Sequence, residues 1–139
     1  MTDRQLLTND LIHDEGLRLT LYPDSRGFPT IGVGRNVRDK GITSAEAMLL
    51  LDHDIDECIH DLMSFGWFSS LDAVRQRTLV NMRFNLGPNR FRGFTKMLHA
   101  VAIGDYAQAA MEMRNSVWAT QVKDRATKLA RRMETGDDL

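Results

Sequence analysis

A single β-hairpin signal near the start of an otherwise helical chain is the feature that most restricts the fold. Leu17, Leu19 and Leu21 alternate with residues of other kinds, which is the period of a strand with one covered face. Residues 23–27, PDSRG, have the composition of a turn, and residues 30–34 read as the returning strand. A helical pattern over residues 3–15, ended by Gly16, precedes this hairpin.

Helix signals follow the hairpin to the end of the chain. Thr43 and Glu46 form a capping box before a helical pattern that runs to about residue 63 or 65. Ser69 or Ser70 can cap the next helix, which Gly87 ends, and further helices are closed by Gly104 and Gly136, with Asp105 and Gln108 as a cap between them. Methionine and phenylalanine side chains are expected to fill the core of these helices.

These patterns predict one α+β domain, mostly helical, over residues 1–139. A small β lobe over residues 15–42 is joined by a connecting helix, residues 43–65, to a helical lobe of residues 66–139 plus 1–14. At 139 residues and 42% hydrophobic, the chain is long enough to bury a core.

Composition and charge narrow the function classes. No apolar run is long enough to span a membrane, and the N-terminus lacks the features of a signal peptide, so we expect synthesis in the cytoplasm. Cys58 is the single cysteine, which excludes an internal disulfide. Residues 1–70 carry 6 Lys and Arg against 12 Asp and Glu, a net charge of −6, whereas residues 71–139 carry 12 against 7, a net charge of +5.

Two acids near the hairpin have contrasting surroundings. Glu15 lies in the last turn of its helix on the face of Leu7 and Leu11, and the helix dipole and desolvation both raise the pKa of a carboxyl group there. Asp24 lies in a polar turn that favours its charged form. Such a pair suits glycoside hydrolysis, in which one carboxyl group protonates the leaving oxygen and the other assists water or the sugar cation.

Geometry sets a condition on this hypothesis. Nine residues of straight strand would separate the two acids by roughly 30 Å, whereas an inverting pair requires roughly 6.5–9.5 Å, so the path between them has to bend. Thr30 could then hold a water molecule beside Asp24. The alternative is that Glu15 is an ordinary exposed acid at a helix end and Asp24 an ordinary turn residue.

With these residues identified, the chain closely resembles the phage-type lysozymes, glycoside hydrolase family 24, over nearly its whole length. The core of the likeness is DEGLRLTLYPDSRGFPTIGVG, in which Glu15, Asp24 and Thr30 match the family's catalytic triad. The segments SLDAVRQRTLVNMRFNLG, GFTKML and DRATKLARRMETG are similar to the family's helical lobe.

The resemblance implies a muramidase of the endolysin type, which lyses host cells without a metal or cofactor. Such an enzyme hydrolyses, with inversion, the β-1,4 bond between N-acetylmuramic acid and N-acetylglucosamine in peptidoglycan. Glu15 would be the general acid, Asp24 would assist the attacking water or stabilise charge on the sugar, and Thr30 would position that water. The partner would be a peptidoglycan strand, reached through a separate membrane-permeabilising protein, and we expect a monomer without stable membrane association.

The resemblance also implies substrate-binding residues. The family's cleft lies between its lobes, where Gly34, Phe84 and Asn85 match lining positions, and Arg125 matches an arginine near the catalytic glutamate. The chain departs from the family pattern in three ways: Arg35 stands where the best-known members have histidine, the segment between residues 37 and 43 is short, and only the C-terminal half is basic.

Other interpretations fit parts of the sequence less well. A catalytically inactive peptidoglycan-binding or inhibitory module would keep the fold without the activity, although the complete triad argues against it. The basic last helix could belong to a nucleic-acid-binding protein, but the sequence lacks the aromatic and groove-binding motifs expected of such proteins. Asp52, Asp54 and Asp56 imitate the start of a calcium loop, but Glu57 stands where glycine is required and Met63 where a glutamate is required. His53, Glu57 and His60 could hold zinc but read as part of a solvated helix face, so we predict no metal site.

Overall fold

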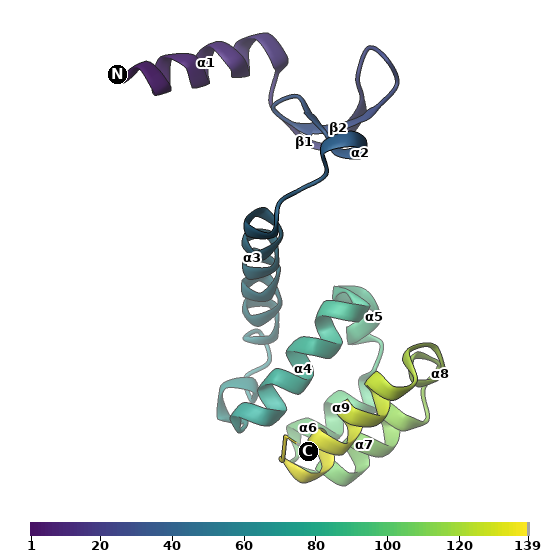
Figure 1. Ribbon diagram of the computed structural model, residues 1–139. Helices are drawn as coiled ribbons and strands as arrows, with labels where there is room; N and C mark the ends of the chain where they lie inside the picture. Colours follow the sequence, from purple (N-terminus) through teal and green to yellow (C-terminus); the bar gives the residue numbers. More distant parts are fainter. Residues whose placement is uncertain (139) are drawn as a thin grey trace. The chain divides into compact units, whose positions relative to one another are not determined.

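The computed structural model describes residues 1–138, and the chain divides into two units, residues 1–50 (unit 1) and residues from 51 onward (unit 2). Its elements, drawn in Figure 1, are α1 (Asp3–Glu15), β1 (Arg18–Pro23), β2 (Pro29–Gly32), β3 (Arg35–Asn36), α2 (Val37–Lys40), α3 (Ser44–Leu62), the 3-10 helix η1 (Phe68–Ser70), α4 (Ala73–Leu86), α5 (Pro88–Arg92), α6 (Thr95–Ala102), α7 (Tyr106–Arg114), α8 (Val117–Val122) and α9 (Asp124–Thr135). The predicted α+β class is confirmed. The assignment of residues 1–14 to the helical lobe stays a prediction.

The sheet of unit 1 is antiparallel with the strand order β1-β2-β3. Arg18 pairs with Gly32 and Tyr22 with Thr30, and the register shifts between these two pairs. Such an irregularity bends a strand, and the path between the two acids runs through it. The predicted hairpin is confirmed, while the short strand β3, which pairs Asn36 with Thr30, was not predicted.

The apolar faces of unit 1 are exposed. Helix α1 begins with a capping box between Thr2 and Gln5, but it contains no buried residue. Leu17, Leu19 and Leu21 of the hairpin are all exposed, Leu19 by 83%. The prediction that this strand has a covered face is therefore wrong for the structure described, because alternation marks an amphipathic strand and does not say what covers it.

The first turn of α3 is fixed by its cap and by an ion pair. The predicted capping box is confirmed, because Thr43 Oγ1 accepts from the Glu46 N–H and Glu46 Oε1 accepts from the Thr43 N–H, at 3.1 and 2.8 Å. Arg35 donates to both carboxylate oxygens of Glu46, at 3.0 and 2.7 Å, and to the Gly41 carbonyl oxygen. The hydrogen bond from Arg35 lowers the pKa of Glu46 to about 2. The arginine at the family's histidine position thus ties β3 to α3.

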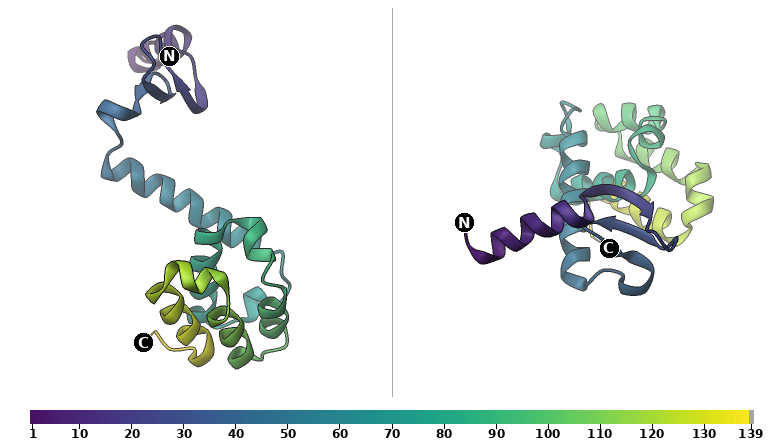
Figure 2. Two further views of the ribbon diagram at one scale, coloured as in Figure 1. Left: turned by 90° about the vertical axis from the view of Figure 1, so that its right-hand side faces the viewer. Right: turned by 90° about the horizontal axis from the view of Figure 1, so that it is seen from above.

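Unit 2 contains the hydrophobic core. Helices α7 and α9 lie side by side within it, as Figure 2 shows. Four of the eight methionines are fully buried there, Met82, Met97, Met113 and Met133, while the other four are exposed. The expectation that methionines fill the core is therefore half correct. The core side chains are Leu62, Phe68, Leu71, Leu79, Met82, Leu86, Phe91, Met97, Ala100, Val101, Ala109, Ala110, Met113, Trp118, Ala126, Leu129, Ala130 and Met133.

Most helix ends of unit 2 match their sequence signals. Asp105 caps α7 through the Gln108 N–H, and Gly87 and Gly136 end α4 and α9. The cap of α4 differs from the prediction, because Asp72 accepts from the Arg75 N–H while the two expected serines lie in η1. Helix α5 was not predicted. None of the helices described in residues 1–138 is both long and apolar enough to cross a membrane.

Asp61 at the end of α3 joins three helices of unit 2. Its carboxylate accepts from Arg83 Nε of α4 at 2.6 Å and from both terminal nitrogens of Arg92 of α5, at 2.9 and 2.6 Å. The hydrogen bonds from Arg92 lower the pKa of Asp61 to about 2. One turn earlier, Cys58 is only 3% exposed, and burial raises the pKa of its thiol.

Candidate functional site

Glu15 is the last residue of α1. The chain leaves the helix at Gly16, whose N–H donates to the Ile12 carbonyl oxygen and whose φ of +80° suits glycine. Glu15 is exposed, and so are Leu7 and Leu11 on its face. Unit 1 therefore does not supply the apolar surroundings that the sequence predicts for this carboxyl group. Its neighbour across unit 1 is Gly34, and a Cβ atom placed on that glycine would lie 2.9 Å from Glu15 Oε2.

Asp24 organises the turn between β1 and β2. Its side-chain Oδ1 accepts hydrogen bonds from the N–H groups of Arg26 and Phe28, at 2.8 and 2.9 Å. Its own N–H donates to the Phe28 carbonyl oxygen, and its carbonyl oxygen accepts from the Gly27 N–H. An aspartate that binds backbone N–H groups ahead of it is typical of such turns. Both side-chain bonds engage Oδ1, and no residue of 1–138 donates to Oδ2.

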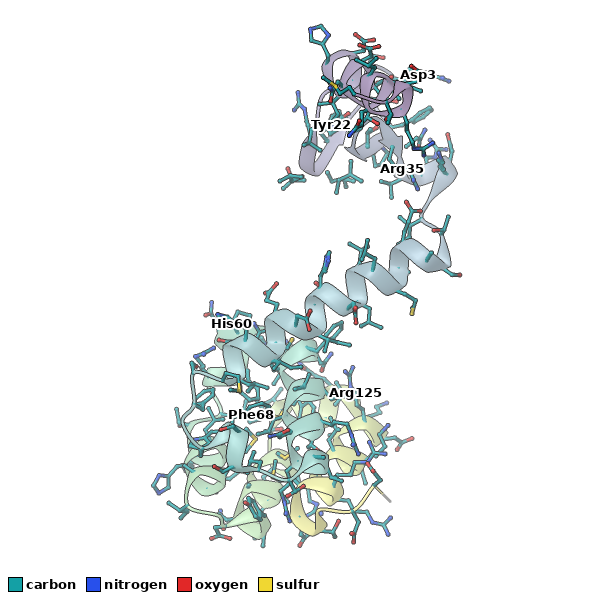
Figure 3. All side chains as sticks on the ribbon, turned by 90° about the vertical axis from the view of Figure 1, so that its left-hand side faces the viewer. Asp3, Tyr22, Arg35, His60, Phe68 and Arg125 are labelled. Atoms are coloured by element: carbon teal, nitrogen blue, oxygen red, sulfur yellow. The ribbon has the colours of Figure 1, made fainter. Side chains whose placement is uncertain are left out.

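Thr30 lies in β2 opposite Tyr22, which Figure 3 labels together with Arg35 on the strands of unit 1. It is 3% exposed, and among residues 1–50 it alone is buried. Its hydroxyl group donates to the Phe28 carbonyl oxygen at 2.8 Å. The hydroxyl proton is thus engaged, and the oxygen keeps lone pairs that can accept a hydrogen bond.

Phe28 is the site-forming residue that sequence reasoning missed. Its backbone binds Asp24 on one side and Thr30 on the other, so it links two members of the predicted triad. The guanidinium groups of Arg26 and Arg38 both lie over its ring, each 5.0 Å from the ring centroid. An aromatic residue inside a polar turn was the available signal, because such a side chain needs a stacking partner there.

Phe84 and Arg125 line one groove of unit 2. The groove has a volume of about 480 Å³ and is mostly apolar, and Ile55 and Ile59 of α3 line it together with Phe84 of α4. Arg125, labelled in Figure 3, donates to Asn81 Oδ1 through Nε and Nη2, at 3.0 and 2.8 Å. The guanidinium group is therefore held by α4 and is not merely solvated.

Asn85 contacts Trp118 and is not among the residues that line the groove of Phe84 and Arg125. Its Oδ1 accepts from the indole Nε1 of the buried Trp118 at 2.8 Å. This bond fixes the orientation of the Asn85 amide and leaves its NH₂ group as the donor. The structure thus brings Phe84 and Arg125 to the same groove and holds Asn85 against Trp118. The triad residues and Gly34 all belong to unit 1.

Comparison with known proteins finds related sequences over almost the whole chain. Residues 13–135 match the family model described as phage lysozyme, a range that includes all seven candidate site residues. The chain is 32% identical to the pre-baseplate central spike protein Gp5 of Enterobacteria phage T4 over 157 residues, covering 91% of this chain and 27% of that protein. It is 28% identical to probable T4-type lysozyme 1 of Dictyostelium discoideum, covering 91% and 92% of the two chains. The endolysin of Salmonella phage P22 is 32% identical, with coverage of 88% and 86%.

Proposed function

Because this chain belongs to the phage lysozyme family, and so to the glycoside hydrolases of the lysozyme class, we propose that it cleaves peptidoglycan as an endolysin. The bond is the β-1,4 linkage between N-acetylmuramic acid and N-acetylglucosamine, and hydrolysis inverts the anomeric carbon. The observation that carries the proposal is the shared attachment of Asp24 and Thr30 to the backbone of Phe28. It orders a carboxylate and a hydroxyl oxygen in one small turn.

In the proposed mechanism Glu15 is the general acid. It donates its proton to the glycosidic oxygen as the bond to the sugar breaks, so that the leaving group departs as a neutral alcohol. Glu15 is the last residue of α1, and its exposed side chain is accessible to a glycan strand.

Asp24 and Thr30 act on the attacking water in this mechanism. Two backbone N–H groups donate to Asp24 Oδ1, an arrangement that suits a carboxylate and leaves Oδ2 to accept a proton from water. The Thr30 hydroxyl donates to Phe28, so its oxygen accepts the second hydrogen of the same water. The water is thereby oriented with a lone pair toward the anomeric carbon.

Further residues are proposed to contact the glycan. Phe84 offers an apolar ring for a sugar face, and the side chains of Asn85 and Arg125 offer N–H donors for hydroxyl and acetamido oxygens. Gly34 allows close approach to the backbone of its turn. We propose that the enzyme acts after a separate membrane-permeabilising protein gives it access to the wall.

Exchange of Glu15 for its amide tests the proposal. Glu15→Gln removes the acidic proton at nearly constant shape, so clearing of outer-membrane-permeabilised Gram-negative cells should fall about 100-fold or more. Asp14→Asn is the matched control, because it makes the same charge change one residue earlier, at an exposed side chain, and should keep wild-type activity. Substantial clearing by Glu15→Gln would refute the role.

The products decide the reaction type. Mass spectrometry of digested peptidoglycan should show reducing ends, whereas anhydro ends would indicate transglycosylation. NMR of freshly formed ends should show the α-anomer, as inversion of a β-linkage requires. Purified wall that binds the protein in a pelleting assay but releases no reducing sugar would favour the inactive binding module instead.

A further inference from the structure

We propose that Gly34 positions Glu15 for catalysis, because the absence of a side chain at residue 34 provides the space that the Glu15 carboxyl group occupies. A Cβ atom on Gly34 would lie 2.9 Å from Glu15 Oε2, 3.1 Å from Cδ and 3.3 Å from Cγ. Non-bonded heavy atoms of this kind pack at roughly 3.5–4.0 Å. A methyl group there would displace the outer half of the glutamate side chain. The inference rests on the proposed role of Glu15 as the general acid.

The position of Gly34 in the hairpin explains how the glycine side of this contact is held. Gly34 lies in the turn between β2 and β3, which is closed by the pairing of Ile31 with Arg35. Arg35 is in turn anchored on Glu46, so the turn is held from its far side. Thr30 is on β2, four residues before Gly34. The same hairpin therefore carries the hydroxyl group that we assign to the water and the backbone surface that limits the general acid.

Two features of residue 34 favour glycine, the positive φ and the closeness of Glu15, and other glycines of the chain serve as controls that distinguish the two. Its φ of +65° disfavours any side chain, but Gly27 and Gly32 share that property with φ of +83° and +70°. A Cβ atom on either of these two glycines would meet no atom within 4 Å. Gly32→Ala thus introduces the backbone strain alone, whereas Gly34→Ala introduces the strain together with the contact to Glu15.

The first experiment compares the kinetics of these two variants on glycan strands of defined length. Gly34→Ala is expected to lower kcat about 100-fold, because a displacement of about 1 Å in a reacting group has that effect. The loss in kcat should exceed any rise in KM, since a misplaced acid affects the chemical step and not uniform binding. Gly32→Ala should keep kcat within about threefold. Equal losses of kcat in the two variants would overturn the proposal.

The second experiment needs no activity. The free energy of unfolding is measured for Gly34→Ala and Gly32→Ala, each with Glu15 present and with Glu15→Ala, which removes all three contacting atoms. With Glu15 present, Gly34→Ala should be the more destabilising change by a small margin, because the end of the flexible Glu15 side chain has to shift, and with Glu15→Ala the two should be equal. If Gly34→Ala alone does not fold, the double variant with Glu15→Ala should fold as Gly32→Ala does.

The two experiments separate the two proposals. A difference between the glycine variants that persists in the Glu15→Ala background would show that Glu15 is not what Gly34 accommodates. If instead Glu15→Gln kept full activity while the stability difference vanished with Glu15→Ala, the contact would stand and the role of general acid would fall. Loss of activity in Glu15→Gln combined with normal kcat in Gly34→Ala would overturn only the positioning role.

Discussion

Lys123 has a backbone conformation that residues with side chains rarely adopt. It connects α8 to α9 with φ of +51° and ψ of −111°, and it is the non-glycine residue with positive φ among residues 1–138. Its N–H donates to the Ala119 carbonyl oxygen and so ends α8. The conformation lets two helices follow each other directly, at a cost in backbone strain.

Replacing Lys123 by glycine should therefore stabilise unit 2. Relief of strain of this kind is worth about 1 kcal/mol after the greater freedom of glycine in the unfolded chain is included. Chemical denaturation of Lys123→Gly measures the gain. Lys123→Ala is the control, because it removes the charge but keeps a Cβ atom, and it should give no gain. A similar gain in both variants would mean that charge is the cause.

Helices α3, α4 and α5 meet at a single carboxylate. Asp61 binds Arg83, which is buried, and Arg92, which is half-buried. Removing one partner of a buried ion pair leaves an uncompensated charge, which typically costs roughly 3–5 kcal/mol. The Asp61 side chain is 21% exposed, so a smaller loss applies here.

We predict that Asp61→Asn lowers the free energy of unfolding by about 2 kcal/mol at neutral pH. Glu57→Gln is the matched control on the same helix, because Glu57 approaches Arg83 only to 3.9 Å and is 74% exposed. It should change the free energy of unfolding by less than about 0.5 kcal/mol. Urea denaturation of the wild type, Asp61→Asn and Glu57→Gln measures both changes in the free energy of unfolding. Equal changes in the two variants would contradict the stabilising role of Asp61.

The same pair should add to the acid sensitivity of unit 2. The folded-state pKa of Asp61 is about 2, below its usual value of 3.8, so the stabilisation is complete above pH 3.8 and is lost as the pH falls toward 2. Asp61→Asn should lack this part of the acid transition. If the free energy of unfolding of Asp61→Asn fell with pH in the same way as that of the wild type, the ion pairs of Asp61 would not be a source of the acid sensitivity.

At the scale of the whole molecule, the core belongs to one unit. Each buried hydrophobic side chain among residues 1–138 lies between Cys58 and Met133, and Thr30 is the buried residue of unit 1. Because burial of apolar surface is the main stabilising contribution to a fold, the two units should differ in independent stability.

A fragment of residues 43–139, which keeps the capping box and the core, should unfold in one cooperative transition. A fragment of residues 1–50 should show no cooperative transition, because it buries too little apolar surface to offset its loss of conformational entropy. Thermal unfolding followed by circular dichroism distinguishes these outcomes. A cooperative transition in the short fragment would contradict the expectation.

The sequence predicted what is encoded locally. Helix ends were predicted where a capping box or a stop glycine marks them, as at Thr43 and Gly136. The cap of α4 was not, because Ser69, Ser70 and Asp72 are all residue types that cap helices and only the fold selects Asp72. The triad stays a prediction that comes from the resemblance to the lysozyme family, and the connection through Phe28 uses backbone atoms, which carry no signal of their own in a sequence.

Long-range partners were also beyond the sequence. The bond between Trp118 and Asn85 joins residues 33 positions apart, and the bidentate pair of Arg35 with Glu46 joins residues 11 positions apart. No periodicity relates such positions. The exposure of the apolar face of α1 was not predicted for the same reason. An apolar stripe indicates that a helix can bury one face, but it does not identify the element that packs against that face.

The burial of Cys58 has a practical consequence for spectroscopy. The thiol is enclosed and its raised pKa keeps it protonated, so it should react slowly with maleimides and methanethiosulfonates. A cysteine introduced on an exposed helix surface would then take up a fluorophore or nitroxide selectively. Site-directed labelling of this enzyme can therefore proceed without first removing its native sulfhydryl group.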